Sequence, residues 1–340
     1  MSGAPEAVVV GGGLAGVAAA VAVARAGLRT LHLAPKGPPD RRTSALMGPS
    51  VEYLRASGLI DDPATLRIID ATDRLIRAPE TLFDSKDAGL EAFGWNFPNI
   101  KLLEAFETAR AALGNLETRE LALSSIERGT TGWVLTLADG SVVETPLVVG
   151  SDGKKSLVRV ATDFRAREHG FTQAALVCDL ELGRRLGGAS VEFHYEQGPF
   201  TLVPAGGSRA NLVWIDDREV LKAAQATGQD GLRAIFLEKS QRLFGDIRLL
   251  PPAHMFLLST LSVERAGMEG IVLAGEAAHA FPPIGAQGLN LGLRDVADLA
   301  ASLATVDRGT PDWARAVSAD YAQRRADDLE RTGGMVDALF

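Results

Sequence analysis

The chain has 340 residues and is 46% hydrophobic, so it is long enough for about two domains and can bury a sizeable core. Its net charge is −8, with no block of like charge that would suggest a nucleic-acid surface. The single cysteine, Cys178, excludes an internal disulfide and fits a reducing compartment. The start of the chain lacks a basic signal-peptide region, and the apolar stretch 14–24 is too short to span a bilayer. We therefore expect a cytoplasmic protein, soluble or peripherally attached to the inner face of the membrane.

The beginning of the chain predicts a strand–turn–helix–strand unit. Residues 7–10 form a short apolar run, an alanine-rich helix extends to about Ala26, and residues 30–33 indicate a second buried strand. Both strands are apolar on most sides, as a parallel sheet covered by helices requires. The turn between the first strand and the helix reads Gly11-Gly12-Gly13-Leu14-Ala15-Gly16.

The glycines of this turn match G-x-G-x-x-G. Gly11 allows the tight turn, Gly13 lets the backbone approach a pyrophosphate, and Gly16 lets the helix lie close to the strand. The helix N-terminus at Leu14 and Ala15 offers unpaired N–H groups to phosphates. In this context the motif predicts a dinucleotide site.

The acidic residue that usually ends the second strand of an NAD site is absent. By spacing, that position is Ala34, followed by Pro35. A carboxylate there would bind the adenosine ribose, so its absence counts against an ordinary NAD site and leaves the ribose needing another partner.

Further along, the patterns predict a helix over 100–113 and a two-residue hairpin at Asp139-Gly140 between residues 133–137 and 141–145. A buried strand over 147–149 ends at Gly150-Ser151-Asp152-Gly153. From about Phe171 to Ser262, alternating strands and two helices predict an antiparallel sheet with helices on one face. The expected strands are 174–181, 190–194, 200–203 and 211–215, and the expected helices are 220–226 and 231–244.

After this region the buried-strand pattern returns at 271–274, followed by a Gly/Pro-rich loop and a long helix from about Leu289. The first domain is therefore assembled from separated pieces of chain. We expect an α/β, Rossmann-like domain and an inserted, mainly antiparallel substrate domain. The first takes residues 1–72, 97–170 and 263–340, and the second takes 73–96 and 171–262.

The segment Gly275–Asp295, GEAAHAFPPIGAQGLNLGLRD, is the most specific in the chain. It resembles the ribose-binding motif and following helix of the flavoprotein aromatic hydroxylases, in particular the ubiquinone-biosynthesis hydroxylases. Other segments resemble the same family in the same order along the chain. They are Arg42-Thr43-Ser44-Ala45-Leu46, Asn99, Gly150–Gly153 with Arg159, Gly198–Pro204, and Val213-Trp214.

The resemblance implies a para-hydroxybenzoate hydroxylase-like fold with FAD as cofactor and no metal. The implied FAD-binding residues are Gly11, Gly13, Leu14, Ala15, Gly16, Arg42, Asn99, Asp152, Gly275, Glu276, Pro283, Gly285, Ala286, Gln287, Gly288, Leu289 and Asn290. The candidates for the substrate pocket are Phe200, Leu202, Trp214 and Pro283.

Three positions depart from the family pattern. Glu276 replaces an aspartate, although its carboxylate can still accept ribose hydroxyls. Pro282 stands where many members have histidine, and Ala286 where they have glycine. Ala286 is harmless at negative φ and costly at positive φ.

The assigned roles have simpler alternatives. Asp152 can cap a turn, and core packing explains Phe200, Leu202 or Trp214 as well as a pocket does. Arg42 is a candidate for the pyrophosphate or ribose, which would offset the lost acid at Ala34, or it is a solvated charge.

Two more motif residues have implied roles. Asn290 would bond the polar edge of the flavin ring, while the helix that begins near Leu289 points its dipole at the ring. His279 resembles a packing and hydrogen-bonding residue rather than a base.

The implied reaction is hydroxylation of a polyprenylated phenol by O₂, through a flavin C4a-hydroperoxide, in ubiquinone biosynthesis. The cofactor carries this reactivity, so the sequence needs no catalytic dyad. NADH, NADPH and a ferredoxin are all open as reductant, and proteins of a biosynthetic complex are possible partners. One alternative is hydroxylation or reduction of another aromatic or isoprenoid substrate. Another is a non-catalytic flavin-binding subunit.

Overall fold

The computed structural model describes residues 3–37, 40, 42–60, 70–72, 74–78, 81–84, 94–187, 189–283 and 287–337. For residues 70–84 and 332–337 the description covers the backbone alone.

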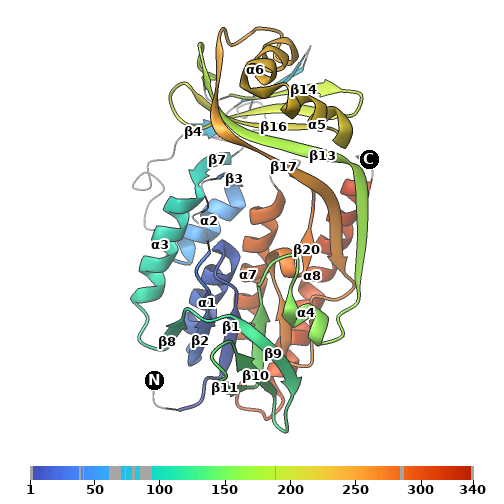
Figure 1. Ribbon diagram of the computed structural model, residues 1–340. Helices are drawn as coiled ribbons and strands as arrows, with labels where there is room; N and C mark the ends of the chain where they lie inside the picture. Colours follow the sequence, from blue (N-terminus) through green and yellow to red (C-terminus); the bar gives the residue numbers. More distant parts are fainter. Residues whose placement is uncertain are drawn as a thin grey trace.

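A six-stranded sheet forms the core of the lower part of the molecule in Figure 1, in the order β18-β19-β12-β1-β2-β8. Its strands are parallel except β18. Every residue of β1, β2, β12 and β19 is buried, which explains why these strands are mostly apolar in sequence. The strands are β1 (Ala7–Val10), β2 (Thr30–Leu33), β8 (Leu116–Arg119), β12 (Leu147–Gly150), β18 (Gly267–Met268) and β19 (Ile271–Leu273).

Helices cover this sheet. The contacts join α1 to α3 and α7, α7 to α8, and α8 to β18 and β19. The helices of this part are α1 (Leu14–Arg25), α2 (Gly48–Ala56), α3 (Asn99–Ala111), α4 (Leu157–Ala161), α7 (Gln287–Thr305) and α8 (Trp313–Asp337).

The parallel strands place several loops at one edge. The loops that begin at Gly11, Ala34, Ser151 and Ala274 follow the carboxyl ends of β1, β2, β12 and β19. The chain moves from β1 to β2 on one side, whereas β12 lies on the other side of β1. Ligands of open α/β sheets bind outside the carboxyl ends of the strands at such a reversal.

An eight-stranded sheet forms the upper part of the molecule, in the order β20-β17-β13-β16-β15-β14-β5-β6. All its pairs are antiparallel except β14 with β5. The long strands β13 and β17 extend from the lower part into this sheet (Figure 1). The strands are β5 (Arg74–Ala78), β6 (Thr81–Asp84), β13 (Ala166–Leu182), β14 (Ala189–Tyr195), β15 (Gly198–Pro204), β16 (Arg209–Asp217), β17 (Ile247–Val263) and β20 (His279–Ala280).

Two helices, α5 (Arg218–Ala226) and α6 (Gly228–Lys239), cover the upper face of this sheet, and the opposite face is turned toward the six-stranded sheet (Figure 1). The described residues also form two smaller antiparallel sheets. One contains β3 (Thr43–Met47), β4 (Asp70–Thr72) and β7 (Gly94–Pro98), and the other β9 (Leu123–Arg128), β10 (Trp133–Leu137) and β11 (Val142–Thr145).

The structure corrects two details of the predicted elements. The hairpin at Asp139-Gly140 has three loop residues, because the Leu137 N–H bonds to the Ser141 carbonyl while Gly140 adopts φ +83°. Helix α6 ends at Lys239 rather than at residue 244, because Gln241 and Arg242 take the left-handed conformation.

The patterns do not predict β17 and α8 as they occur. In β17, Pro251 and Pro252 interrupt the strand signal. Part of the buried face of α8 is charged, through Arg325 and Asp328, so apolar periodicity does not reveal it. None of the helices in the described part of the chain has the length and apolarity needed to cross a bilayer.

Candidate flavin site

The glycine turn after β1 is built by close backbone contacts. Gly11 has φ +131°, and a Cβ there would lie 2.1 Å from the Ser151 carbonyl oxygen. A Cβ on Gly16 would lie 2.0 Å from the Gly11 carbonyl oxygen. Protein packing alone therefore requires glycine at both positions.

Gly13 differs because, apart from its chain neighbours and the backbone of its own helix, no atom of the described residues lies within 4 Å of the Cβ it would carry. It is exposed and forms the N-cap of α1, a fully described helix with no side-chain cap. The first N–H groups of a helix have no intrahelical partner and attract anions. Open space and free donors at the same point fit the diphosphate of a dinucleotide.

The second half of the site is the 3-10 turn Gly275–Ala277, at the end of β19. Gly275 has φ +61°, and its Cβ would lie 3.1 Å from the Ala15 Cβ. A Cβ on Gly292 would also be close to Ala15, at 3.4 Å. Small residues therefore bring this turn, α1 and α7 together, and Glu276 remains exposed beside the N-terminus of α1.

Arg42 belongs to a polar cluster before β3. Its Nε and Nη2 atoms donate to the two carboxylate oxygens of Asp40, at 2.8 and 2.7 Å. Asn99 Nδ2 also donates to Asp40, at 2.8 Å, and Ser44 Oγ donates to Asn99 Oδ1 at 2.6 Å. Bonds to Asp40, with a further contribution from the charge of Glu276, raise the pKa of Arg42.

The same bonds act on Asp40. Burial tends to raise its pKa, but hydrogen bonds from Arg42 and Asn99 outweigh burial and hold the pKa below its ordinary value. Asp40 is therefore ionised and fixes the Arg42 guanidinium in a two-point contact. The sequence patterns single out Arg42 and Asn99 but not Asp40.

The Asn290 side chain joins α7 to β3. Its Nδ2 donates to the Ala45 carbonyl at 2.8 Å, and its Oδ1 accepts from the Met47 N–H at 2.9 Å. It is buried. The structure therefore assigns it contacts with the backbone of β3, whereas its contact with the flavin stays a prediction.

Asp152 makes the contacts of a helix cap. Its Oδ1 accepts from Ser156 Oγ, and its Oδ2 accepts from the Leu157 N–H at 2.8 Å and the Val158 N–H at 3.2 Å. These bonds match the alternative in which Asp152 caps a turn. Its role in FAD binding stays a prediction.

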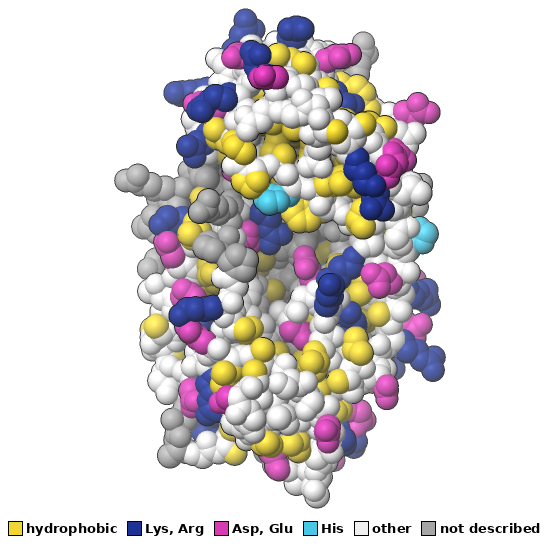
Figure 2. Space-filling view, viewed as in Figure 1, with side chains coloured by type: hydrophobic (Ala, Val, Ile, Leu, Met, Phe, Trp, Pro, Cys, Tyr) yellow, Lys and Arg dark blue, Asp and Glu magenta, His cyan; other side chains and the backbone are white. Residues whose placement is uncertain are grey.

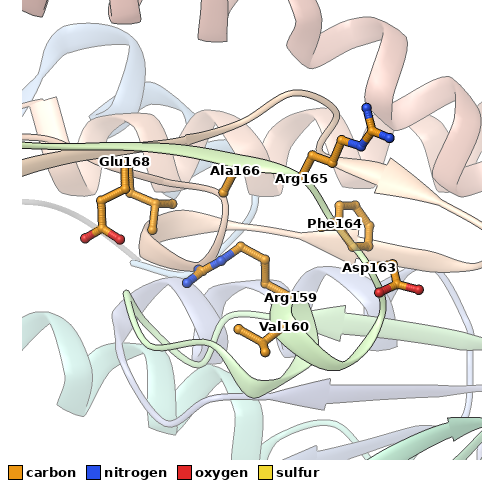
Figure 3. Close-up of a pocket in the computed structure, with 8 residues that line it drawn as sticks. Arg159, Val160, Asp163, Phe164, Arg165, Ala166 and Glu168 are labelled. Carbon is orange, nitrogen blue, oxygen red and sulfur yellow. The ribbon is translucent and has the colours of Figure 1, made fainter.

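Arg159 is buried and links the loop after β12 to the turn after β19. Its guanidinium donates to the Ala277 carbonyl at 2.8 Å and to the Lys154 carbonyl at 2.6 Å. A hollow of about 760 Å³ lies beside it, next to α4 and the start of β13 (Figure 3). In Figure 3 Arg165 extends away from Arg159, and none of the predicted FAD contacts that the structure describes lines this hollow.

His32 is a buried residue of the site that the motifs do not reveal. Its Nε2 lies 2.8 Å from the Gly11 carbonyl, and its Nδ1 lies 3.4 Å from Arg110 Nη1. Since a carbonyl accepts and a guanidinium donates, the ring is neutral with its proton on Nε2. Burial lowers the pKa of His32 to about 4. The hydrogen bond to Gly11 tends to raise the pKa, but burial outweighs it. A polar residue within the apolar run 30–33 is the signal that could have identified it.

The pocket candidates Phe200, Leu202 and Trp214 take the core-packing role that the sequence left open for them. All three are buried in the core between the sheet and helices α5 and α6. The Trp214 ring packs against Phe236 of α6 at a centroid distance of 6.1 Å. Because alternate strand residues point to opposite faces, these three side chains point away from the six-stranded sheet.

The other face of the same strands carries its own apolar cluster. Ala175, Ile215 and Leu258 are buried there, and Val177 and Val213 pack against them. This cluster faces the lower part of the molecule. Figure 2 shows a hollow between the upper sheet and the lower part of the molecule, with positively and negatively charged side chains on its walls.

The remaining predicted residues lie around the start of α7. Pro283 is exposed, and α7 begins at Gln287, followed by exposed Gly288 and half-buried Leu289. Apart from its chain neighbours and the backbone of its own helix, no described atom lies within 4 Å of a Cβ on Gly288. Gly285 and Ala286 lie outside the described residues.

The fold and the convergent turns define a dinucleotide-binding protein of the α/β type. The chain matches the model of the family described as FAD binding domain over residues 5–331, and it belongs to that family. Its cofactor is FAD, as predicted.

Two curated proteins are similar along most of their length. One is the ubiquinone hydroxylase UbiL of Rhodospirillum rubrum, 31% identical over 95% of this chain and 78% of that protein. The other is 3-demethoxyubiquinol 3-hydroxylase of Escherichia coli, 27% identical over 97% of this chain and 88% of that protein. The crystal structure of p-nitrophenol 4-monooxygenase PnpA from Pseudomonas putida has a TM-score of 0.79 at 19% identity, covering 98% of this chain and 89% of that one. This likeness confirms the predicted fold class.

Proposed function

We propose that this protein is an FAD-dependent monooxygenase that hydroxylates the aromatic ring of a polyprenylated phenol in ubiquinone biosynthesis. One observation carries the proposal: the FAD motifs meet at one sheet edge, beneath an apolar face of the second sheet. The similarity to two hydroxylases of ubiquinone biosynthesis supports this substrate class.

In this proposal the chain holds FAD through three groups. The N-terminus of α1 at Gly13 takes the diphosphate, because its N–H groups face open space. The Glu276 carboxylate accepts ribose hydroxyls. Arg42, fixed by Asp40, supplies a positive charge near Glu276. Its contact with the pyrophosphate or ribose offsets the cofactor contact that is lost because Ala34 is not an acid.

In this proposal the half-buried Val177 and Val213, on β13 and β16, orient the substrate ring, and the buried Ala175, Ile215 and Leu258 pack beside them. When bound, FAD supplies the transfer of one oxygen atom from O₂ to an electron-rich ring. The apolar wall excludes water from the reacting ring and gives it a fixed position.

A single-turnover experiment tests this function without knowledge of the natural reductant. The purified holoprotein is reduced chemically under anaerobic conditions and mixed with isotopically labelled O₂ and a short-chain 2-polyprenylphenol. We expect the product, analysed by mass spectrometry, to carry one labelled oxygen atom on its ring. Flavin reoxidation that yields hydrogen peroxide and leaves the phenol unchanged would contradict the proposal. A tail-less phenol, tested in parallel, distinguishes a soluble aromatic substrate from a polyprenylated one.

A further inference from the structure

Asp295 lies behind the Gly275–Ala277 turn, on the buried side of α7. Its side chain is 1% exposed. Oδ2 accepts the Gly275 N–H at 2.8 Å and lies 2.6 Å from His279 Nε2. One carboxylate oxygen therefore contacts both ends of the segment 275–279.

The other oxygen of Asp295 faces α8. Arg325 Nε and Asp295 Oδ1 form an ion pair at 2.7 Å. Arg325 is 2% exposed and also contacts Asp298 and Asp328, each at 2.8 Å. A buried carboxylate without such a partner would be strongly unfavourable.

The balance of charges keeps Asp295 ionised. Burial tends to raise its pKa, but His279, Arg325 and the Gly275 N–H together hold the pKa below its ordinary value. An ionised carboxylate binds N–H donors more strongly than a neutral one does. Asp295 thus has both the charge and the position to fix the turn.

From this arrangement we infer that Asp295 is a positioning residue for FAD, and that it ties the cofactor turn to α8 through Arg325. The inference rests on the FAD site of the proposed function. Gly275 has φ +61° and is followed by the exposed Glu276, so the backbone at 275–279 sets the direction of the Glu276 carboxylate. Asp295 holds that backbone from the side opposite to Glu276.

The substitution Asp295→Asn tests this role with almost no change in size. Oδ2 of Asp295 meets two donors, and Oδ1 forms an ion pair with the Arg325 guanidinium. An amide has one acceptor oxygen and one NH₂ group, so one orientation places the NH₂ group against the two donors of the turn. The other orientation places it against the Arg325 guanidinium, and both orientations remove the negative charge that pairs with Arg325. We expect the dissociation constant of FAD to rise by at least about tenfold, equivalent to about 1.4 kcal/mol. The visible circular dichroism of the bound flavin should also change.

Asp298→Asn is the control variant. It also removes one carboxylate from Arg325, but Asp298 is 30% exposed and none of its described hydrogen bonds reaches the turn. We expect Asp298→Asn to bind FAD within about twofold of the unmodified protein. FAD titration by flavin fluorescence and thermal melting of each apoprotein separate affinity from stability. If Asp295→Asn lowered only the melting temperature and bound FAD normally, Asp295 would be a structural residue and the inference would be overturned.

A second pair of variants applies if Asp295→Asn does not fold. His279→Gln retains an N–H donor toward Asp295, whereas His279→Leu does not. We expect the glutamine variant to retain FAD affinity and the leucine variant to lose it by about tenfold or more. Equal affinity in both would refute the inference. An unmodified protein that fails to bind FAD would instead refute the proposed function, so the two failures are distinguishable.

Discussion

At the scale of single residues, the glycines of the first turn are needed for two different reasons. Gly11 and Gly16 are fixed by protein atoms at 2.1 and 2.0 Å, whereas Gly13 has open space around its Cβ position. A side chain at Gly11 or Gly16 must therefore disturb folding. A side chain at Gly13 disturbs only what approaches the turn from outside.

Gly13→Ala should therefore weaken FAD binding without loss of stability. Its φ of −76° is allowed for alanine, so the apoprotein should melt within about a degree or two of the unmodified protein. The methyl group would occupy the space of the diphosphate, and we expect the FAD dissociation constant to rise by about tenfold or more. Gly11→Ala is the contrast: at φ +131° and with the clash at Ser151 it should fold poorly. Unchanged FAD affinity in Gly13→Ala would refute the assignment of the diphosphate to this turn.

Two polar residues show what a motif leaves open. Asp152 and Asn290 stand at positions that the resemblance assigns to FAD, yet the structure gives both of them contacts within the protein. The partners of Asn290, Ala45 and Met47, are more than 240 residues away in sequence. A motif reports that a residue type is needed at a position, but not which of its neighbours needs it.

At the scale of elements, His32 connects β2 to the turn after β1 and to α3. Its pKa of about 4 in the folded protein lies below the ordinary value of 6.5. When the pH falls, the unfolded chain therefore takes up the proton first. The stabilisation by neutral His32 is complete above about pH 6.5 and is lost as the pH falls toward 4.

We expect the free energy of unfolding to fall across this range by up to about 3 kcal/mol on account of His32. His32→Gln can keep the N–H donor to Gly11 and does not titrate, so it should lack this part of the pH dependence. Urea unfolding of both proteins between about pH 7 and pH 4.5 measures the difference. Parallel curves for the two proteins would show that His32 does not titrate in this way. Asp295, whose pKa is lowered from 3.8, acts below this range.

Successive residues of β16 point to opposite faces of the sheet. Trp214 points into the core with α6, and its neighbour Val213 belongs to the cluster on the opposite face. A shift of one residue exchanges the two faces of a strand. Neighbouring substitutions should therefore have different effects.

Trp214→Ala should destabilise the protein by about 3–5 kcal/mol, because it empties a fully buried site. Val213→Phe should leave FAD affinity unchanged and raise KM for the phenol, because it fills the space that faces the flavin. Urea unfolding, FAD titration and steady-state kinetics on both variants check this pair. If Val213→Phe left KM unchanged, another face would have to bind the substrate.

At the scale of the whole molecule, the site is assembled from segments that are far apart in the chain. The turns at Gly11 and Gly275 lie at the same sheet edge because β1, β12 and β19 are parallel neighbours, and Arg42 lies in the segment that follows β2, the neighbour of β1 on its other side. Helix α8, near the end of the chain, reaches this assembly through Arg325 and Asp295. Ion pairs between distant helices follow no sequence period, which explains why the patterns do not predict this connection.

Local patterns predict the strand–turn–helix unit at residues 7–33 and the long helix from about Leu289, because backbone periodicity and glycine geometry are local properties. The use of FAD follows instead from the resemblance of whole motifs to a family. The tertiary structure decided the partners of Asp40, Asp152, Asn290 and Asp295, and the face of the second sheet on which each side chain lies. These depend on register and on contacts between distant segments. The sequence places Trp214 on the correct strand, but only the packing of α5 and α6 shows that Val213, and not Trp214, faces the flavin domain.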